Sequence, residues 1–129
     1  MSDENPDMAV FLRVYRRKNG KKGAYLQMDI KLINRETEGE VLLEGRLDAV
    51  AAAEADEILM KIAGRFQRVV LNMEKLDYIS SAGLRTLKMI HMTMKKKNGE
   101  MILRNVNTLV MEVFEVTGFV ALFNIENKD

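Results

Sequence analysis

Two adjacent serines, Ser80 and Ser81, occupy the place in the sequence best suited to chemistry. An apolar run at residues 69–71 and a short polar turn precede them, and a segment of helical period follows. Ser80 stands where an N-cap is expected, so its hydroxyl can accept from a backbone N–H of the first turn. Ser81 then falls at the positive end of the helix dipole, a position that suits a group gaining or meeting negative charge. Ser81 is therefore a candidate regulatory site, with an ordinary capping hydroxyl as the alternative.

The helix that follows the serines has two distinct faces. At 100° per residue one face carries the expected core residues, and Gly83 permits close packing at its start. The roughly opposite side carries Ala82, Met89 and Met92, surrounded by Arg85, Lys88 and Lys96. This second side is either a partly covered helix face or a partner-binding surface, because methionine adapts to different partners. The predicted core residues are Leu84, Leu87, Ile90 and Met94.

The inventory of reactive side chains argues against an enzyme. The chain has one histidine, His91, and no cysteine. Ser81 and His91 are ten residues apart on one predicted helix, about 15 Å at 1.5 Å per residue, which is too far for a nucleophile and its base. Without thiolates, a second histidine or a suitably spaced acidic cluster, we expect no metal site. A glycine-rich P-loop with its lysine is not present, so we expect no nucleotide cofactor.

Composition narrows the class of protein. The chain has 129 residues, which suits one domain with a real core. Its formal net charge is +1, so affinity for nucleic acid or for an anionic membrane is not expected. The apolar runs are far shorter than the roughly 20 residues of a membrane helix, and no signal peptide is recognisable. The lack of cysteine fits a reducing compartment. We expect a soluble cytoplasmic protein.

Residues 1–27 differ from the remainder, residues 28–129, which we predict to form the domain. Residues 8–15 can form an edge strand, and residues 16–22 are a basic run, RRKNGKK. The run is a solvated tail or hairpin turn, with a binding arm as the alternative. A second hypothesis is that Met28 is the natural start and that the preceding residues come from an upstream in-frame reading.

From Met28 onward the predicted elements are regular. Strands are expected at residues 29–34, 40–46, 68–72, 100–104 and 122–125, and the first two form an antiparallel pair. Three helices are expected. One follows an N-cap at Asp48 and ends at Gly64, one follows Ser80 and ends near Lys97, and a short one follows an N-cap at Asn107 and runs through Val116. Strand–helix–strand alternation gives parallel neighbours with right-handed crossovers. The sequence predicts a single α/β domain of order ββαβαβα(β), a small, mostly parallel mixed sheet with helices mainly on one face.

Four segments resemble one family in order and spacing. They are GRLDA at 45–49, the strand ending VVLN, YISSAGLRTL at 78–87 and NGEMIL at 98–103. They resemble the STAS domain and, within it, the stand-alone bacterial anti-sigma factor antagonists. The similarity covers about residue 28 to the C-terminus, and the serine segment is its most specific part. The family fold, a small mixed sheet with helices on one face, agrees with the predicted order.

The resemblance implies a partner-switching function. Such antagonists bind an anti-sigma factor that is also a serine kinase of the histidine-kinase-like ATPase type, and so release a sigma factor. The kinase phosphorylates one serine, which corresponds to Ser81, and a PP2C-type phosphatase restores it. Many members have an aspartate before the acceptor and a serine or threonine after it. Here these positions are Ser80 and Ala82, although Asp77 is near, so Ser80 is a minor alternative acceptor.

Other interpretations remain open beside this one. The chain can be a STAS docking subunit of a different assembly, such as a stressosome or a lipid-transport complex, in which Ser81 need not be phosphorylated. A nucleotide-binding module and an enzyme are the remaining alternatives. The predicted partner-binding residues are Asp77, Ser80, Ser81, Ala82, Gly83, Arg85, Met89 and Met92.

Overall fold

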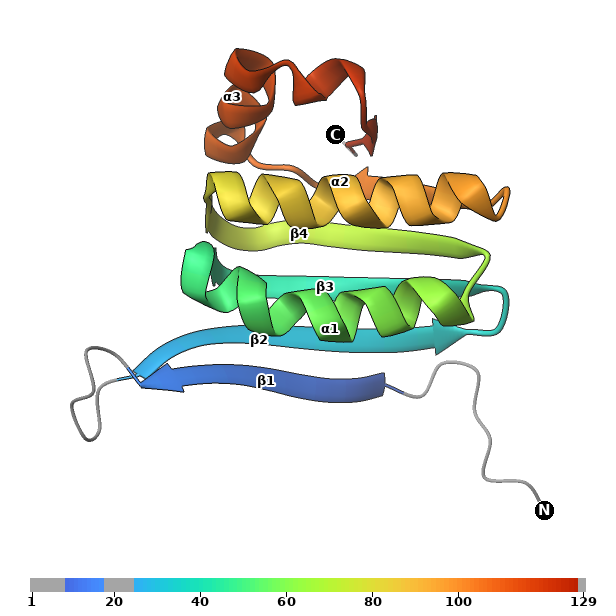
Figure 1. The fold of residues 1–129 in the computed structure, drawn as a ribbon, viewed down its shortest axis with the longest axis horizontal. Helices are drawn as coiled ribbons and strands as arrows, with labels where there is room; N and C mark the ends of the chain where they lie inside the picture. The colour runs from blue at the N-terminus through green and yellow to red at the C-terminus, as the bar shows by residue number, and fades with distance from the viewer. Residues whose placement is uncertain (1–8, 18–24, 128–129) are drawn as a thin grey trace.

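The computed structural model describes residues 9–17 and 25–127, with side chains from residue 28 onward (Figure 1). The basic run at 16–22 therefore lies mostly outside the described residues, as do residues 128–129 of the polar tail. The elements in chain order are β1 (Ala9–Arg17), β2 (Tyr25–Arg35), β3 (Glu38–Leu47), α1 (Ala49–Arg65), β4 (Arg68–Ile79), α2 (Ser81–Lys96), β5 (Glu100–Arg104), α3 (Thr108–Thr117), the 3₁₀ turn η2 (Phe119–Ala121) and β6 (Asn124–Glu126).

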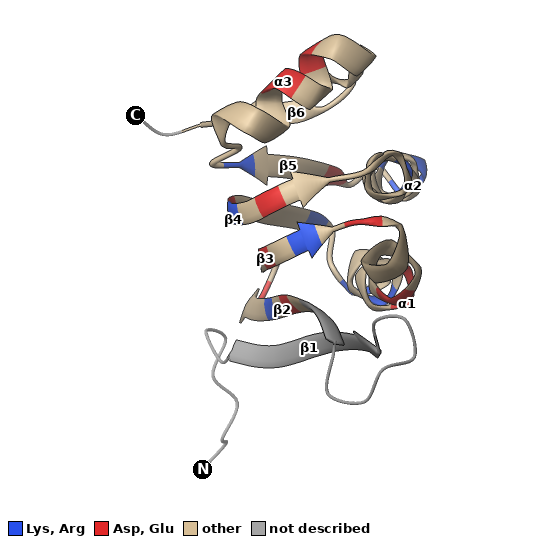
Figure 2. Cartoon of the chain, turned by 90° about the vertical axis from the view of Figure 1, so that its left-hand side faces the viewer, with Lys and Arg blue, Asp and Glu red and all other residues tan. Residues whose placement is uncertain are grey.

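These strands form one six-stranded mixed sheet in the order β1-β2-β3-β4-β5-β6. The pairs β1–β2 and β2–β3 are antiparallel, and the pairs from β3 to β6 are parallel. Helices α1 and α2 lie side by side on one face, while α3 lies beyond β5 at the end of the sheet (Figure 2). The predicted fold class and the element order from Met28 are confirmed. The division of the chain at Met28 stays a prediction.

Several element boundaries differ from the prediction. Strand β2 begins at Tyr25, earlier than expected. Helix α1 passes through Gly64, whose Cα faces open space, and ends at Arg65, where the Phe66 amide bonds to the Ile62 carbonyl. The predicted strand at 122–125 starts later, at Asn124, because the amides of residues 122 and 123 both bond to the Phe119 carbonyl and cannot join the sheet.

The largest error of the prediction concerns β4. This strand was expected to end at Asn72 and to be followed by a polar turn. The strand runs on to Ile79, and Met73, Leu76 and Ile79 are buried at intervals of three residues. Its register against β3 shifts twice, between Leu42 and Glu44 and between Gly45 and Arg46. Each shift is a bulge that adds one residue to β4. Because a bulge breaks the period of two, the pattern did not look like a strand.

One apolar core fills the space between the sheet and the two helices. All four residues predicted for the buried stripe of α2 are at most 4% exposed. They pack with the alternate residues of β3 and β4 that face the helices. The buried members of α2 are Gly83, Leu84, Thr86, Leu87, Ile90 and Met94.

Charged side chains cover the opposite face of the sheet. Arg68 of β4 bonds to Glu38 of β3 at 2.8 Å and to Glu100 of β5 at 2.9 Å. Val70 and Ile102 each follow one of these residues by two positions and so lie on the same face, and both are buried although they lie outside the helix-side core. The hydrocarbon parts of long charged side chains can cover apolar groups in this way. This face therefore presents ion pairs rather than an apolar surface.

Candidate functional site

The two serines lie where β4 passes into α2, and their hydroxyls have different surroundings. Ser80 is the N-cap, and its hydroxyl oxygen accepts from the Gly83 amide at 3.1 Å. The same hydroxyl donates to the Leu47 carbonyl at 3.1 Å, and the Ser80 amide donates to that carbonyl at 3.0 Å. Ser80 is thus half-buried and committed to the fold.

Ser81 is the first residue of α2 and is exposed. Among the described residues, no hydrogen bond to its hydroxyl is found. The amides of Gly83 and Leu84 are satisfied by the side chain and the carbonyl of Ser80. This leaves the amides of Ser81 and Ala82 without an acceptor in the described part of the chain. A free hydroxyl therefore stands beside free N–H groups at the positive end of a helix.

Close backbone packing fixes this end of α2. A Cβ placed on Gly83 would lie 2.8 Å from the Leu47 carbonyl oxygen and 2.8 Å from Cγ1 of Ile79. Asp48, which follows Leu47 in the chain, caps α1 by accepting a hydrogen bond from the Ala51 amide at 2.9 Å. The starts of α1 and α2 therefore lie at the same end of the sheet, as Figure 1 shows. The prediction of Asp48 and Ser80 as N-caps, and of close packing at Gly83, is confirmed.

The outer face of α2 carries the predicted methionines. Met89 is 40% exposed and Met92 46% exposed, and Arg85, Lys88 and Lys96 are exposed around them. We call these five residues the α2 patch.

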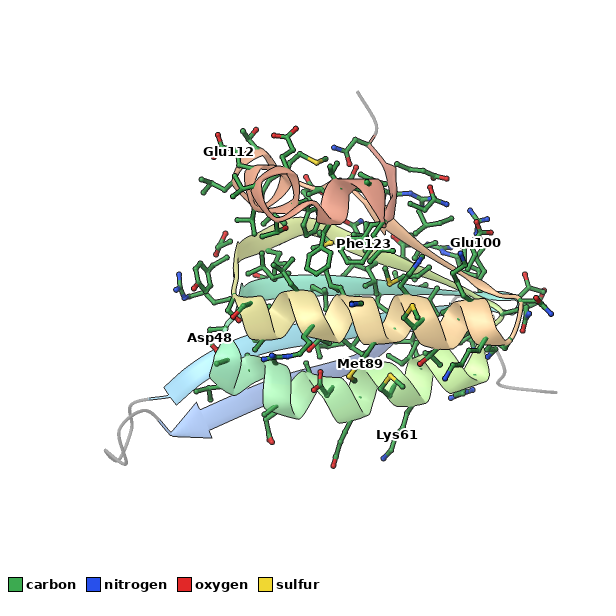
Figure 3. The ribbon with its side chains drawn as sticks, turned by 45° about the horizontal axis from the view of Figure 1, so that its top comes forward. Asp48, Lys61, Met89, Glu100, Glu112 and Phe123 are labelled. Carbon is green, nitrogen blue, oxygen red and sulfur yellow. The ribbon has the colours of Figure 1, made fainter. Side chains whose placement is uncertain are left out.

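Met89 lies between α2 and α1, where a groove of about 200 Å³ separates the helices (Figure 3). The buried Thr86 hydroxyl joins the two helices by bonding to the carboxylate of Asp56. The groove is otherwise lined mainly by small residues, so α1 and α2 leave room there for part of a partner's side chain. The lining residues are Ala49, Ala52, Ala53, Asp56, Ala82, Arg85, Thr86 and Met89.

A second apolar surface was not predicted from the sequence. Leu109 is 66% exposed and Val116 87% exposed on α3. With Tyr78 and the half-buried Val113 they form what we call the α3 patch. A pocket of about 120 Å³ lies between the end of β4 and α3, and Asp77, Tyr78 and Leu109 are among the residues that line it. The signal in the sequence was the spacing of Leu109, Val113 and Val116, which lie on one side of a short helix whose other side buries Val110 and Phe114.

The two patches differ in charge. The α2 patch contains three cations, whereas exposed Asp77 and Glu112 lie beside the α3 patch. Figure 2 shows acidic positions on α3. The Arg46 guanidinium lies 4.2 Å from the centre of the Tyr78 ring. Ser81 follows Tyr78 by three residues, so the candidate site spans two patches of opposite sign.

His91 lies on another side of α2 and takes no part in this surface. Its ring is 6.0 Å, centre to centre, from the ring of Phe123 in an edge-on arrangement. The Nδ1 atom is buried and has no hydrogen-bond partner among the residues that the structure describes. Burial, and secondarily the charge of Lys95, lowers the pKa of His91 below its usual 6.5. The prediction that it is a packed or boundary residue agrees with this placement.

Two other classes of site are absent from the described residues. No cluster of three or more histidine, cysteine, aspartate or glutamate side chains that could hold a metal ion occurs among them. Within the same residues, none of the helices combines the length and the apolarity needed to span a membrane.

Comparison with known proteins places this geometry in a family. Residues 31–128 match the STAS domain. BtrV of Bordetella bronchiseptica, named as an anti-sigma factor antagonist, is 37% identical over 83 residues, which are 61% of this chain and 72% of BtrV.

Solved structures agree in fold. The unphosphorylated form of the anti-sigma factor antagonist SpoIIAA superposes with a TM-score of 0.62 at 17% identity, over 78% of this chain and 89% of that one. The phosphorylated form of SpoIIAA from Bacillus gives 0.63 at 18% identity, over 78% and 91%. The match over most of the chain, together with the shared fold, shows that the chain belongs to the STAS domain family.

Proposed function

We propose that this protein is an anti-sigma factor antagonist that is switched off by phosphorylation of Ser81. It binds an anti-sigma factor that is also a serine kinase of the histidine-kinase-like ATPase type, and so frees a sigma factor. A PP2C-type phosphatase returns it to the binding state. The names of BtrV and SpoIIAA support the class. The observation that carries the proposal is the exposed Ser81 hydroxyl at the start of α2, near the α2 and α3 patches, with no hydrogen-bond partner among the described residues.

The hydrogen bonds favour Ser81 over Ser80 as the acceptor. A kinase must approach the hydroxyl and remove its proton, and the Ser80 proton is already donated to the Leu47 carbonyl. Phosphate on Ser80 would also displace the bond to the Gly83 amide that caps α2. Modification of Ser80 would thus disturb the fold, whereas modification of Ser81 changes only the surface.

The charge of the phosphate explains how the switch acts. A phosphoserine carries about −1.5 to −2 charges and three acceptor oxygens. The free amides at the start of α2 and the positive end of its dipole favour that charge. Arg85 is one turn further on the same side of the helix, within reach of an i, i+4 pair. The free protein therefore accommodates phosphate, while a docked partner would have to bury or face a dianion.

The two patches define the chemistry of the partner. A surface that covers the α2 patch must offer acidic or apolar groups to Arg85 and Lys88. A surface that covers the α3 patch must offer basic groups to Asp77 and Glu112. Complementary charges steer association and select the partner more than they raise affinity. We place this exchange in the cytoplasm, where sigma factors act, and propose no direct contact with nucleic acid or membrane.

Incubation with ATP and each of the host's anti-sigma kinases of this type tests the proposal. Intact mass and peptide mapping are expected to show one phosphate, on Ser81. Ser81→Asp is expected to keep the unfolding midpoint but to weaken binding about 100-fold, since an unpaired buried charge costs about 3 kcal/mol or more. Ser81→Ala, the matched control, keeps binding in the presence of ATP. An aspartate variant that binds normally contradicts the switch.

A specific residue favours the second candidate, a STAS docking subunit that is not phosphorylated. Ser80 stands where much of the family has an aspartate, which weakens the resemblance to a kinase substrate. For this candidate the same experiment gives stable binding to a partner with no phosphate on Ser81 after ATP. Neither binding nor phosphate, across all such kinases, contradicts the proposed antagonist, whereas a docking subunit of another assembly need not bind a kinase.

A further inference from the structure

Met89 and Met92 are the methionines most exposed to an oxidant in the described part of the chain. They are 40% and 46% exposed, whereas Met94, in the same helix, is 0% exposed. Met28, Met73 and Met101 are also buried, and Met60 and Met111 are half-buried. The reactivity of a thioether toward oxidants follows its accessibility. Exposure therefore separates two methionines of α2 from a third in the same helix.

These two methionines lie on the same side of α2 as Ser81. At about 100° per residue, Met92 lies about 20° from Ser81 around the helix axis and Met89 about 80°. Along the axis they are about 17 and 12 Å from it. A change at either sulfur therefore alters the surface that phosphate on Ser81 also alters.

From this placement we infer that Met89 and Met92 form a peroxide-sensitive modification site that controls the α2 patch independently of phosphorylation. The inference rests on the proposed function for its effect on partner binding. Its other part, the selective oxidation of this site, stands on the exposure of the side chains alone.

The reaction requires hydrogen peroxide and no other reagent. A sulfur lone pair attacks one peroxide oxygen, the O–O bond breaks, and that oxygen stays on sulfur. The proton of the transferred hydroxyl joins the departing hydroxide, which leaves as water. Sulfur loses two electrons to become a sulfoxide, and the peroxide gains them. Methionine sulfoxide reductases reverse the change, so the site can act as a switch.

The neighbouring cations make the sulfoxide more favourable in the free protein than in the protein docked to a partner. Arg85 is one turn from Met89, and Lys88 and Lys96 are each one turn from Met92, all exposed. Their N–H groups can donate to the sulfoxide oxygen while the protein is free. A docked apolar partner surface cannot, and burying a polar group without its hydrogen bonds is costly. Oxidation should therefore weaken docking and leave the fold intact.

Peptide mapping of the folded full-length chain after limited hydrogen peroxide treatment tests the site. Trypsin releases residues 89–95, MIHMTMK, as one peptide that contains two exposed methionines and one buried methionine. Fragment masses are expected to place oxygen on Met89 and Met92 and to leave Met94 unmodified. In denaturant all three are expected to oxidise equally. Equal oxidation of Met94 in the folded chain would overturn the inference.

Two further measurements address the surface and the partner. The oxidised chain is expected to elute earlier in hydrophobic interaction chromatography, with an unchanged unfolding midpoint, and Met89→Leu/Met92→Leu should largely remove this shift. Affinity for the anti-sigma kinase that binds the untreated chain is expected to fall about tenfold or more, and methionine sulfoxide reductases A and B should restore it. Selective oxidation with unchanged affinity overturns the inference. If no kinase binds the untreated chain, the proposed function fails, while the mass map and the elution shift still decide the oxidation site.

Discussion

Replacing Ser80 and Ser81 by alanine, one at a time, separates the two roles of the adjacent serines. Ser80→Ala removes a hydroxyl that both caps α2 through the Gly83 amide and donates to the Leu47 carbonyl. Ser81→Ala removes a hydroxyl that has no partner in the described structure. The first change is expected to act on stability and the second on phosphorylation.

The size of the effect follows from the bonds that are lost. Loss of an N-cap costs about 1 kcal/mol, and up to about 2 in tightly packed cases. The Leu47 carbonyl keeps its bond from the Ser80 amide at 3.0 Å, so the second lost bond adds only about 0.5 kcal/mol. Ser80→Ala should therefore lower the free energy of unfolding by about 1.5 kcal/mol, which is about 6 °C in Tm for a domain of this size. Ser81→Ala should stay within about 0.5 kcal/mol of the parent.

Urea unfolding followed by circular dichroism gives both differences, and the ATP reaction with the kinase gives the acceptor. Ser80→Ala should still gain phosphate on the intact Ser81, with its lower stability as the main defect. Ser81→Ala should gain none. Two results together refute the reasoning. Ser80→Ala would be as stable as the parent, and phosphorylation would be lost from Ser80→Ala but not from Ser81→Ala.

Three further expectations follow from other residues. Burial lowers the pKa of His91 in the folded state, so the contribution of the neutral imidazole to stability is fully present above pH 6.5 and is lost as the pH falls through the folded pKa. Urea midpoints of the parent and of His91→Gln, compared across this pH range, separate the effect of His91 from that of the carboxylates. Gly83→Ala should cost about 1–2 kcal/mol, since overlap with Leu47 and Ile79 outweighs the gain in helix propensity; equal thermal midpoints would contradict this. Leu109→Ser should leave the unfolding midpoint unchanged and weaken partner binding about fivefold or more, because the side chain is 66% exposed; calorimetry measures it, and normal affinity would exclude the α3 patch from the interface.

Much of the fold follows from local signals in the sequence. The N-caps at Asp48, Ser80 and Asn107 were predicted correctly, because a short polar side chain before a segment of helical period has few other uses. Strand β5 was predicted with its full bounds. Each N-cap bonds to an amide only three residues further on, so local sequence decides it, and the alternation of strands and helices then fixes the sheet order.

The errors arise where distant residues decide the structure. The second half of β4 is held by its pairing with β3, and its two bulges hide the strand pattern. The burial of Val70 and Ile102 depends on arginine and glutamate from three different strands. For the candidate site, Ser81 and the α2 methionines share one helix and could be grouped from the sequence. The α3 patch could not, because the spacing of its apolar residues does not show which side of α3 is packed, and Tyr78 comes from a different element.

The two bulges of β4 also set a rule for changes in chain length. One extra residue reverses which side of the strand each later side chain faces, and a second restores the original alternation. Leu71 and Ile79 both face the helices for this reason, and Leu76, between the bulges, does so at an even position. Losing one residue between 73 and 78 would turn Ile79 and the start of α2 toward the wrong face of the sheet. Losing two would shorten the strand but keep the face, so homologous chains of this family should vary here in steps of two.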